Sequence, residues 1–228
     1  MAQTPCRLAL QLGLDVSDSV DSREYRLQLD GLATALLDSE VTLALLAIPD
    51  LPVALSIFEW SGQGARRLLL DWKLIRNETD IFEVADQLKR TSRGDMSVST
   101  GLGNAMLYSA KRFSTAPACP RQVLDISGDG KNNDGPRPQD VHASLPEHML
   151  VNALVIGPNL NGAVGARARE TEDLVAYFRA YVLRGPEAFV EVAIGYEDYS
   201  DAMRRKLLKE IQVLTLSDFL PATRGPGE

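Results

Sequence analysis

An acidic residue and two serines follow the first apolar run of the chain, in the order Asp-x-Ser-x-Ser. The run spans residues 8–14 and predicts a buried strand, after which Asp15, Ser17 and Ser19 lie within one short turn. Hard cations such as Mg²⁺ prefer several oxygen ligands, and this turn offers a carboxylate and two hydroxyls. Because the three side chains together carry one formal negative charge, a cation bound there would still attract an anionic ligand. The alternative interpretation is a helix-capping turn, which Ser and Asp also favour.

Two further segments carry polar side chains at comparable places. Thr100 stands where a helical stretch begins, and Asp129 lies between two glycines after a second apolar strand at 122–127. In open α/β sheets, ligands bind at the carboxyl ends of the strands. We therefore expect one site that gathers Asp15, Ser17, Ser19, Thr100 and Asp129.

Strand and helix patterns alternate along the chain. We predict strands at 8–15, 53–60, 66–75, 122–127, 150–156 and 188–194, and helices at 21–38, 41–48, 79–91, 101–113, 139–147, 171–182 and 199–214. A short turn at 61–64 links the second and third predicted strands. Because so short a link permits only a hairpin, the third strand is expected to be antiparallel to the second. The alternation predicts an α/β fold with a mostly parallel sheet covered on both faces. One domain is expected over 4–216, with 217–228 as a flexible tail.

The charge of the chain argues against nucleic acid as a partner. The formal net charge is -7 and the sequence pI is about 5.0, and an acidic surface repels a phosphate backbone. No apolar run approaches the roughly 20 residues that a transmembrane helix needs. The first residues carry no signal-peptide pattern, as expected either of a cytoplasmic protein or of a chain whose signal has been removed.

Together, the Asp-x-Ser-x-Ser turn, the Thr and the Asp-Gly after a strand resemble the metal-ion-dependent adhesion site of the von Willebrand factor A domain. The resemblance implies a Rossmann-like three-layer fold with one antiparallel edge strand and helices on both faces. It also implies Mg²⁺, or Mn²⁺ or Ca²⁺, bound by the hydroxyls of Ser17, Ser19 and Thr100. Asp15 and Asp129 would act directly or through water. The remaining coordination position would take an acidic group of a partner protein.

The chain resembles one bacterial family of von Willebrand factor A-like proteins of unknown function, which are usually exported. The segments that carry this resemblance are 25–28 (YRLQ), 59–60 (EW), 125–130 (DISGDG), 132–135 (NNDG), 185–190 (GPEAFV) and 205–211 (RKLLKEI). It covers nearly the whole chain, from about Cys6 to Ile211. Departures include prolines at 138 and 146, where the family typically has an Ala- and Arg-rich helix, and neither touches an expected metal ligand.

The same resemblance implies a pairing of the two cysteines. In the A-domain fold, the strands that follow Cys6 and Cys119 are parallel neighbours, so the cysteines would lie side by side within disulfide range. A structural disulfide favours an oxidising compartment, and we therefore expect a periplasmic or secreted protein. The alternative is a cytoplasmic protein with two buried free thiols.

Two functions follow from these residues. The first is a binding module without enzymatic activity, in which the metal captures a carboxylate of a partner. Asp18, Asn132, Asn133 and Asp134 would form the partner-binding rim, although solvated turns explain these residues more simply. The second is a Mg²⁺-dependent phosphatase of the haloacid dehalogenase type that uses Asp15 and Asp129. The segment 128–134 resembles the metal motif of that superfamily with one residue too many, and Ser17 replaces an acid that its mechanism needs.

Overall fold

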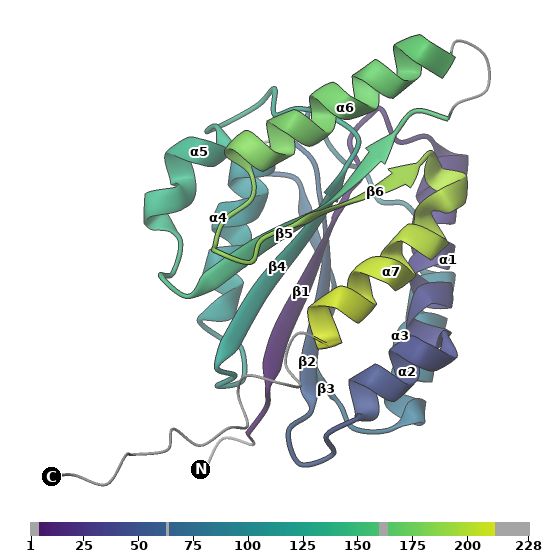
Figure 1. Ribbon diagram of the computed structural model, residues 1–228, viewed down its shortest axis with the longest axis vertical. Coiled ribbons are helices and arrows are strands. Elements are labelled where there is room, and N and C mark those ends of the chain that lie inside the picture. Colours follow the sequence, from purple (N-terminus) through teal and green to yellow (C-terminus); the bar gives the residue numbers. More distant parts are fainter. Residues whose placement is uncertain (1–4, 63, 160–163, 213–228) are drawn as a thin grey trace, which may run out of the picture.

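A computed structural model describes residues 5–62, 64–159 and 164–212 (Figure 1). Its centre is a six-stranded sheet in the order β3-β2-β1-β4-β5-β6. The strands are β1 (Leu8–Asp15), β2 (Val53–Trp60), β3 (Arg66–Ile75), β4 (Arg121–Gly128), β5 (Met149–Gly157) and β6 (Val190–Ile194). All neighbours pair in parallel except β2 and β3, which form the expected antiparallel hairpin at the sheet edge.

Helices cover both faces of this sheet (Figure 1). They are α1 (Ser22–Leu37), α2 (Ser39–Leu46), α3 (Glu78–Arg90), α4 (Leu102–Phe113), α5 (Pro138–Val141), α6 (Val164–Tyr181) and α7 (Tyr199–Gln212), with short 3-10 turns η1 (His142–Ser144) and η2 (Tyr196–Asp198). The apolar residues of α1, α2, α3 and α7 pack in one core and those of α4, α5 and α6 in a second core. The predicted three-layer α/β architecture is therefore confirmed.

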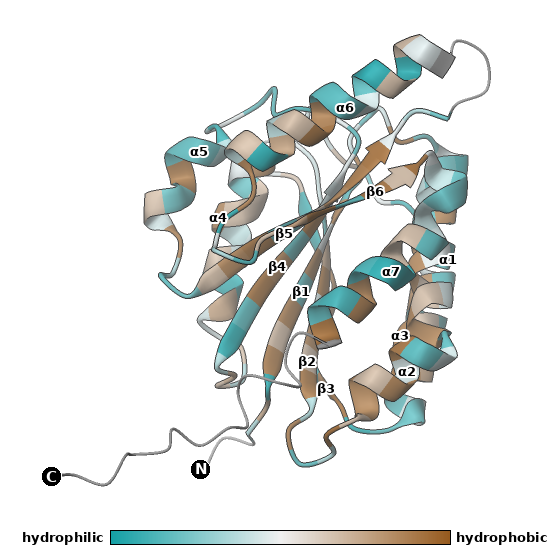
Figure 2. Ribbon diagram, viewed as in Figure 1, coloured by the Kyte–Doolittle hydropathy of each residue, from teal (hydrophilic) through white to brown (hydrophobic). Residues whose placement is uncertain are grey.

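The central position of β1 explains its apolar sequence. Leu8, Leu10 and Leu12 enter the core of one face, whereas Ala9 enters the core of the other. A strand covered on both sides needs apolar residues at successive positions. In Figure 2 the strands are mainly hydrophobic, whereas each helix also carries hydrophilic residues. Among the described residues, no helix has the length and apolar character that a membrane span requires.

Several predicted helix boundaries differ from those of the structure, among them α2, which spans Ser39–Leu46 rather than 41–48. The region 139–147 contains only α5 and η1 instead of one longer helix, and Pro146 follows these two short elements. Helix α6 begins at Val164 rather than at Thr171, whose hydroxyl donates to the carbonyl of Arg167 within the helix. Helix α3 begins at Glu78, one position before the predicted range, and its N-cap is Asn77. The tail predicted at 217–228 lies outside the described residues.

The predicted pairing of the cysteines is confirmed. Cys6 and Cys119 form a disulfide with a Cα–Cα distance of 4.9 Å. They precede β1 and β4, which are adjacent parallel strands with Leu8 opposite Arg121. The bridge therefore lies at the amino ends of these strands, at the edge of the sheet opposite Asp15.

A buried group of charges, which sequence reasoning missed, joins α7 to the sheet. Lys206 of α7 is fully buried and forms ion pairs with Asp125 of β4 at 3.1 Å and with Glu210 at 2.7 Å. The side-chain amide of Asn152 on β5 donates to Glu210 at 3.1 Å. Burial raises the pKa of Asp125 to about 7, although the neighbouring ammonium of Lys206 opposes this shift. Two carboxylates therefore share one cation in the interior.

Candidate metal centre

The Asp-x-Ser-x-Ser turn begins at the carboxyl end of β1. Asp15 is fully buried, and its Oδ1 accepts a hydrogen bond from the backbone N–H of Ser17 at 2.9 Å. The other oxygen, Oδ2, is buried and has no hydrogen-bond partner. The capping interpretation of this turn is wrong, because Asp21 caps α1 in a capping box with Glu24. The turn is therefore left with polar groups that no helix uses.

All five predicted ligands lie together. The hydroxyl of Thr100 donates to that of Ser17 at 3.4 Å, and the hydroxyls of Ser17 and Ser19 lie 3.3 Å apart. The hydroxyl of Ser19 donates to Oδ1 of Asp129 at 2.8 Å. Ser17 and Thr100 are 83 residues apart in the chain. The hydrogen bonds thus join three distant segments into one continuous set of oxygens.

The electrostatics of this set favour a cation. Burial, and then the charge of Asp129, raises the pKa of Asp15 to about 8. Burial also raises the pKa of Asp129, which hydrogen bonds from Ser19 and Tyr196 partly offset. Within the described ranges, no Lys, Arg or His forms an ion pair with either carboxylate. A divalent cation would supply the missing positive charge, and the unpartnered Oδ2 of Asp15 is a free donor for it.

The composition of the donor set fits a hard cation. Three of its five side chains are hydroxyls, and the part of the chain that the structure describes contains no group of three or more His, Cys, Asp or Glu that could hold a metal. Oxygen donors of this kind suit Mg²⁺, Mn²⁺ or Ca²⁺ better than softer metals. Ser17, Ser19 and Thr100 would hold such an ion together with the two carboxylates.

A glycine keeps space beside the unpartnered oxygen. A Cβ atom at Gly128, the last residue of β4, would lie 3.2 Å from Oδ2 of Asp15. Because that distance is tighter than ordinary van der Waals contact, a side chain there would crowd the oxygen. The glycine before Asp129 therefore allows β4 to pass close to Asp15.

Three of the four predicted rim residues instead support the loop that carries Thr100. Asn133 accepts a hydrogen bond from the backbone N–H of Thr100 at 2.8 Å, and Asn132 accepts one from the N–H of Gly103 at 3.3 Å. Asp134 accepts one from the hydroxyl of Ser99 at 2.9 Å. The fourth residue, Asp18, is exposed beside the site. The structure thus gives the segment 132–134 an internal role, and its contact with a partner stays a prediction.

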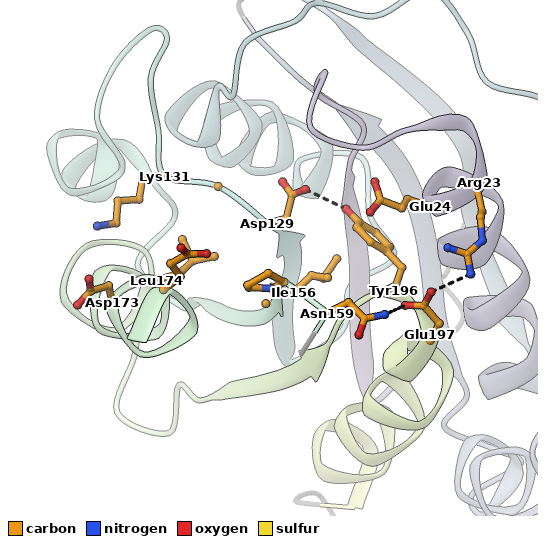
Figure 3. Close-up of a pocket in the computed structure, with 15 residues that line it drawn as sticks. Arg23, Glu24, Asp129, Lys131, Ile156, Asn159, Asp173, Leu174, Tyr196 and Glu197 are labelled. Carbon is orange, nitrogen blue, oxygen red and sulfur yellow. Dashed lines mark hydrogen bonds and ion pairs between the residues drawn. The ribbon is translucent and has the colours of Figure 1, made fainter. Parts of the chain in front are cut away.

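Sequence reasoning missed Tyr196. Its hydroxyl donates to Oδ2 of Asp129 at 3.3 Å (Figure 3). Burial, followed by the nearby charge of Asp129, raises the pKa of Tyr196 well above its usual range. A cavity of about 560 Å³ opens beside this pair, and its walls include Glu24, Lys131 and Asp173. Tyr196 lies 67 residues after Asp129 in no motif, so the sequence held no signal for this contact.

Comparisons with known proteins agree with this fold. Residues 5–215 match a protein family described as protein of unknown function (DUF1194). No curated protein matches the chain. Proximal thread matrix protein 1 from the mussel byssus is 15% identical, with a TM-score of 0.60 over 92% of this chain and 49% of that chain. Its structure with a zinc-occupied MIDAS motif is 13% identical, with a TM-score of 0.56 over 92% and 47%.

A bacterial structure gives the same result. The von Willebrand factor type A protein from Catenulispora acidiphila is 14% identical, with a TM-score of 0.57 over 90% of this chain and 43% of that chain. The chain thus spans about half the length of the mussel protein and less of the bacterial one. At these identities the likeness shows the fold alone, which is that of a von Willebrand factor A domain. By the match over residues 5–215, the chain belongs to the DUF1194 family.

Proposed function

We propose that this chain is a metal-dependent protein-binding module. A divalent cation, with Mg²⁺ as the native ion and Mn²⁺ or Ca²⁺ as substitutes, would be held by Asp15, Ser17, Ser19, Thr100 and Asp129. When bound, the ion would act as a Lewis acid that accepts one carboxylate oxygen of a partner. The observation that carries this proposal is the buried Oδ2 of Asp15, which has no hydrogen-bond partner. Three hydroxyls and a second carboxylate complete the same cluster of oxygens.

The donor set favours recognition over catalysis. Its hydroxyls are hydrogen-bonded to one another and to Asp129, which fixes their positions. In the described portion of the chain, none of these hydroxyls is paired with a His side chain that could act as a base. A nucleophilic hydroxyl needs an adjacent base to activate it. The mussel protein with a zinc-occupied MIDAS motif supports a divalent ion in this fold. We therefore assign a binding role rather than an enzymatic one.

The partner would present a carboxylate to the cation. Asp18 is exposed beside the site, and the cavity next to Asp129 gives room for the residues that flank such a carboxylate. We further propose that the protein acts in an oxidising compartment, the periplasm or the cell exterior, because the Cys6–Cys119 disulfide is stable there.

Calorimetric titration of chelator-stripped protein tests the metal site. We expect one saturable site for Mg²⁺ and Mn²⁺, which Asp129→Ala or Asp15→Asn removes. The matched control is Asp18→Asn, which removes an exposed charge from the same loop and should change the affinity less than about twofold. Because Asp15 is buried without a full set of partners, Asp15→Asn should fold at least as stably as the parent in chelator. Equal Mg²⁺ affinity in both variants and the parent would contradict the site.

The carboxylate claim needs its own test. Metal-loaded protein is titrated with two acetylated pentapeptides that differ only in a central Asp or Asn, and only the Asp peptide should bind. In parallel, an aryl phosphate is incubated with protein and Mg²⁺. Turnover that Asp15→Ala abolishes would replace the binding role with phosphatase activity.

A further inference from the structure

Both oxygens of the Asp129 carboxylate accept hydrogen bonds, and the two donors differ in kind. Ser19, a candidate metal ligand, donates to Oδ1 at 2.8 Å. Tyr196, which lies on η2 after β6, donates to Oδ2 at 3.3 Å. A carboxylate bound at both oxygens has a fixed plane, whereas one bound at a single oxygen can rotate. The orientation of Asp129 therefore depends on a residue outside the ligand set.

The hydroxyl of Tyr196 is itself held in place. The side chain is 6% exposed, and its ring stacks on that of Tyr199 with centroids 6.5 Å apart. The preceding Gly195 has a φ of 76° and donates its N–H to the carbonyl of Gly157 at 2.9 Å, which ties the turn to the end of β5. A positive φ of this size suits glycine and few other residues. The backbone is thus fixed at the residue that precedes Tyr196.

The residue after Tyr196 is fixed as well. Glu197 accepts a hydrogen bond from Arg23 of α1 at 2.8 Å and one from Asn159 at 3.3 Å (Figure 3). Contacts from α1, β5 and α7 therefore converge on one turn. Tyr196 is presented to Asp129 by three elements rather than by a single loop.

The neighbouring cavity shows what the hydrogen bond prevents. Asp129 and Tyr196 both line the cavity of about 560 Å³. Without the tyrosine hydroxyl, Oδ2 of Asp129 would face this space and its solvent. The carboxylate would then leave the orientation in which it meets Ser19.

We propose that Tyr196 is a positioning residue of the metal site, which holds Asp129 in the orientation that a small cation requires. This inference rests on the proposed function. Mg²⁺ demands near-ideal octahedral geometry at about 2.0–2.1 Å, whereas Ca²⁺ accepts irregular geometry at about 2.3–2.6 Å. Tyr196 therefore contributes to the selection of Mg²⁺ over Ca²⁺ as well as to affinity.

The test is Tyr196→Phe in the full chain, titrated with Mg²⁺ and with Ca²⁺ after chelator treatment. The change removes one hydroxyl and keeps the stacked ring. We expect Mg²⁺ affinity to fall about tenfold, the size expected for loss of a hydrogen bond to a charged group, and Ca²⁺ affinity to fall less than about threefold. The matched control is Tyr199→Phe, since that hydroxyl lies near Ser127 and Asp125 instead. It should leave the ratio of the two affinities unchanged.

The ratio separates positioning from a structural role, because a general loss of folding lowers both affinities together. An unchanged Mg²⁺-to-Ca²⁺ ratio in Tyr196→Phe, with parent-like Mg²⁺ binding, would overturn this inference and leave the proposed function standing. A parent protein that binds no divalent cation would overturn both.

A second measurement uses the parent protein alone and does not depend on the folding of a variant. If Tyr196 strengthens metal binding, the metal must stabilise the Tyr196 turn by the same free energy. Hydrogen exchange should therefore show that Mg²⁺ slows amide exchange across Gly195, Tyr196 and Glu197. Exchange rates there that Mg²⁺ leaves unchanged would contradict the coupling.

Discussion

Asn133 binds both backbone polar groups of Thr100. Its side-chain oxygen accepts from the Thr100 N–H at 2.8 Å, and its own N–H donates to the Thr100 carbonyl at 3.0 Å. The loop after β4 thus fixes the loop before α4 at Thr100, whose hydroxyl belongs to the candidate metal site. Asn133 was predicted for the partner-binding rim, which stays a prediction, and its observed contacts support the loop that carries Thr100.

Asn133→Ala should weaken Mg²⁺ binding without unfolding the protein. The substitution removes the side-chain acceptor and keeps the backbone bond, so the Thr100 hydroxyl should become less well placed. We expect a loss of about 1 kcal/mol in the binding free energy, roughly fivefold in affinity, by calorimetry. Asn133→Asp keeps the acceptor and should retain most of the binding. Parent-like affinity in Asn133→Ala would show that the backbone bond alone positions Thr100.

Lys206→Met should destabilise the protein strongly. The ammonium lies between the buried carboxyl groups of Asp125 and Glu210, and its removal leaves these acidic groups without their cation. Breaking a buried pair in this way costs about 3–5 kcal/mol, measured by urea unfolding. The control is Lys209→Met on the same helix. Its ion pair with Glu191 is more exposed, so it should cost less than about 1 kcal/mol. Similar losses in the two variants would contradict a special role for the buried charges.

The stability of the protein should depend on the titration of Asp125. Burial raises its pKa from the ordinary value of 3.8 to about 7, so between these values the folded state holds a proton that the unfolded chain has released. Its contribution to stability is therefore complete below the unfolded pKa and is lost as the pH rises through about 7.

Asp125→Asn removes this dependence. With both proteins in chelator, the free energy of unfolding of the variant minus that of the parent should increase by about 2 kcal/mol as the pH rises from about 5 to about 7. The free energies of unfolding of the two proteins in urea, compared at each pH, cancel the contributions of other groups. A difference that stays constant across this range would show that Asp125 is ionised throughout.

Loss of the disulfide should lower stability and leave the metal site intact. Cys6 and Cys119 are 113 residues apart, and a bridge over so long a loop contributes about 5 kcal/mol in the chain-entropy model. The Cys6→Ala/Cys119→Ala variant should unfold at a lower urea concentration than the oxidised parent, with unchanged Mg²⁺ affinity. Equal stability of the variant and the oxidised parent would mean that the bridge adds nothing in the folded chain.

The sequence by itself determined the architecture and the candidate ligands. Apolar runs buried on both faces identify β1 and the strand before Asp129, and the order of the three polar motifs predicts their meeting at one edge of the sheet. These signals are local, because strand periodicity and turn chemistry act over a few residues. The start of α6 at Val164 was missed because residues 165–170, which are exposed or half-buried, show no apolar periodicity.

Only the tertiary structure decided which side chains hold the site in place. Asn133 reaches Thr100 from 33 residues away, and Tyr196 reaches Asp129 from 67 residues away. Lys206 likewise meets Asp125 only because α7 packs against the sheet. Such contacts depend on how helices and loops pack on the sheet, which no local pattern encodes. The candidate ligands were therefore visible in the sequence, whereas the residues that contact them from distant segments appeared only in the folded chain.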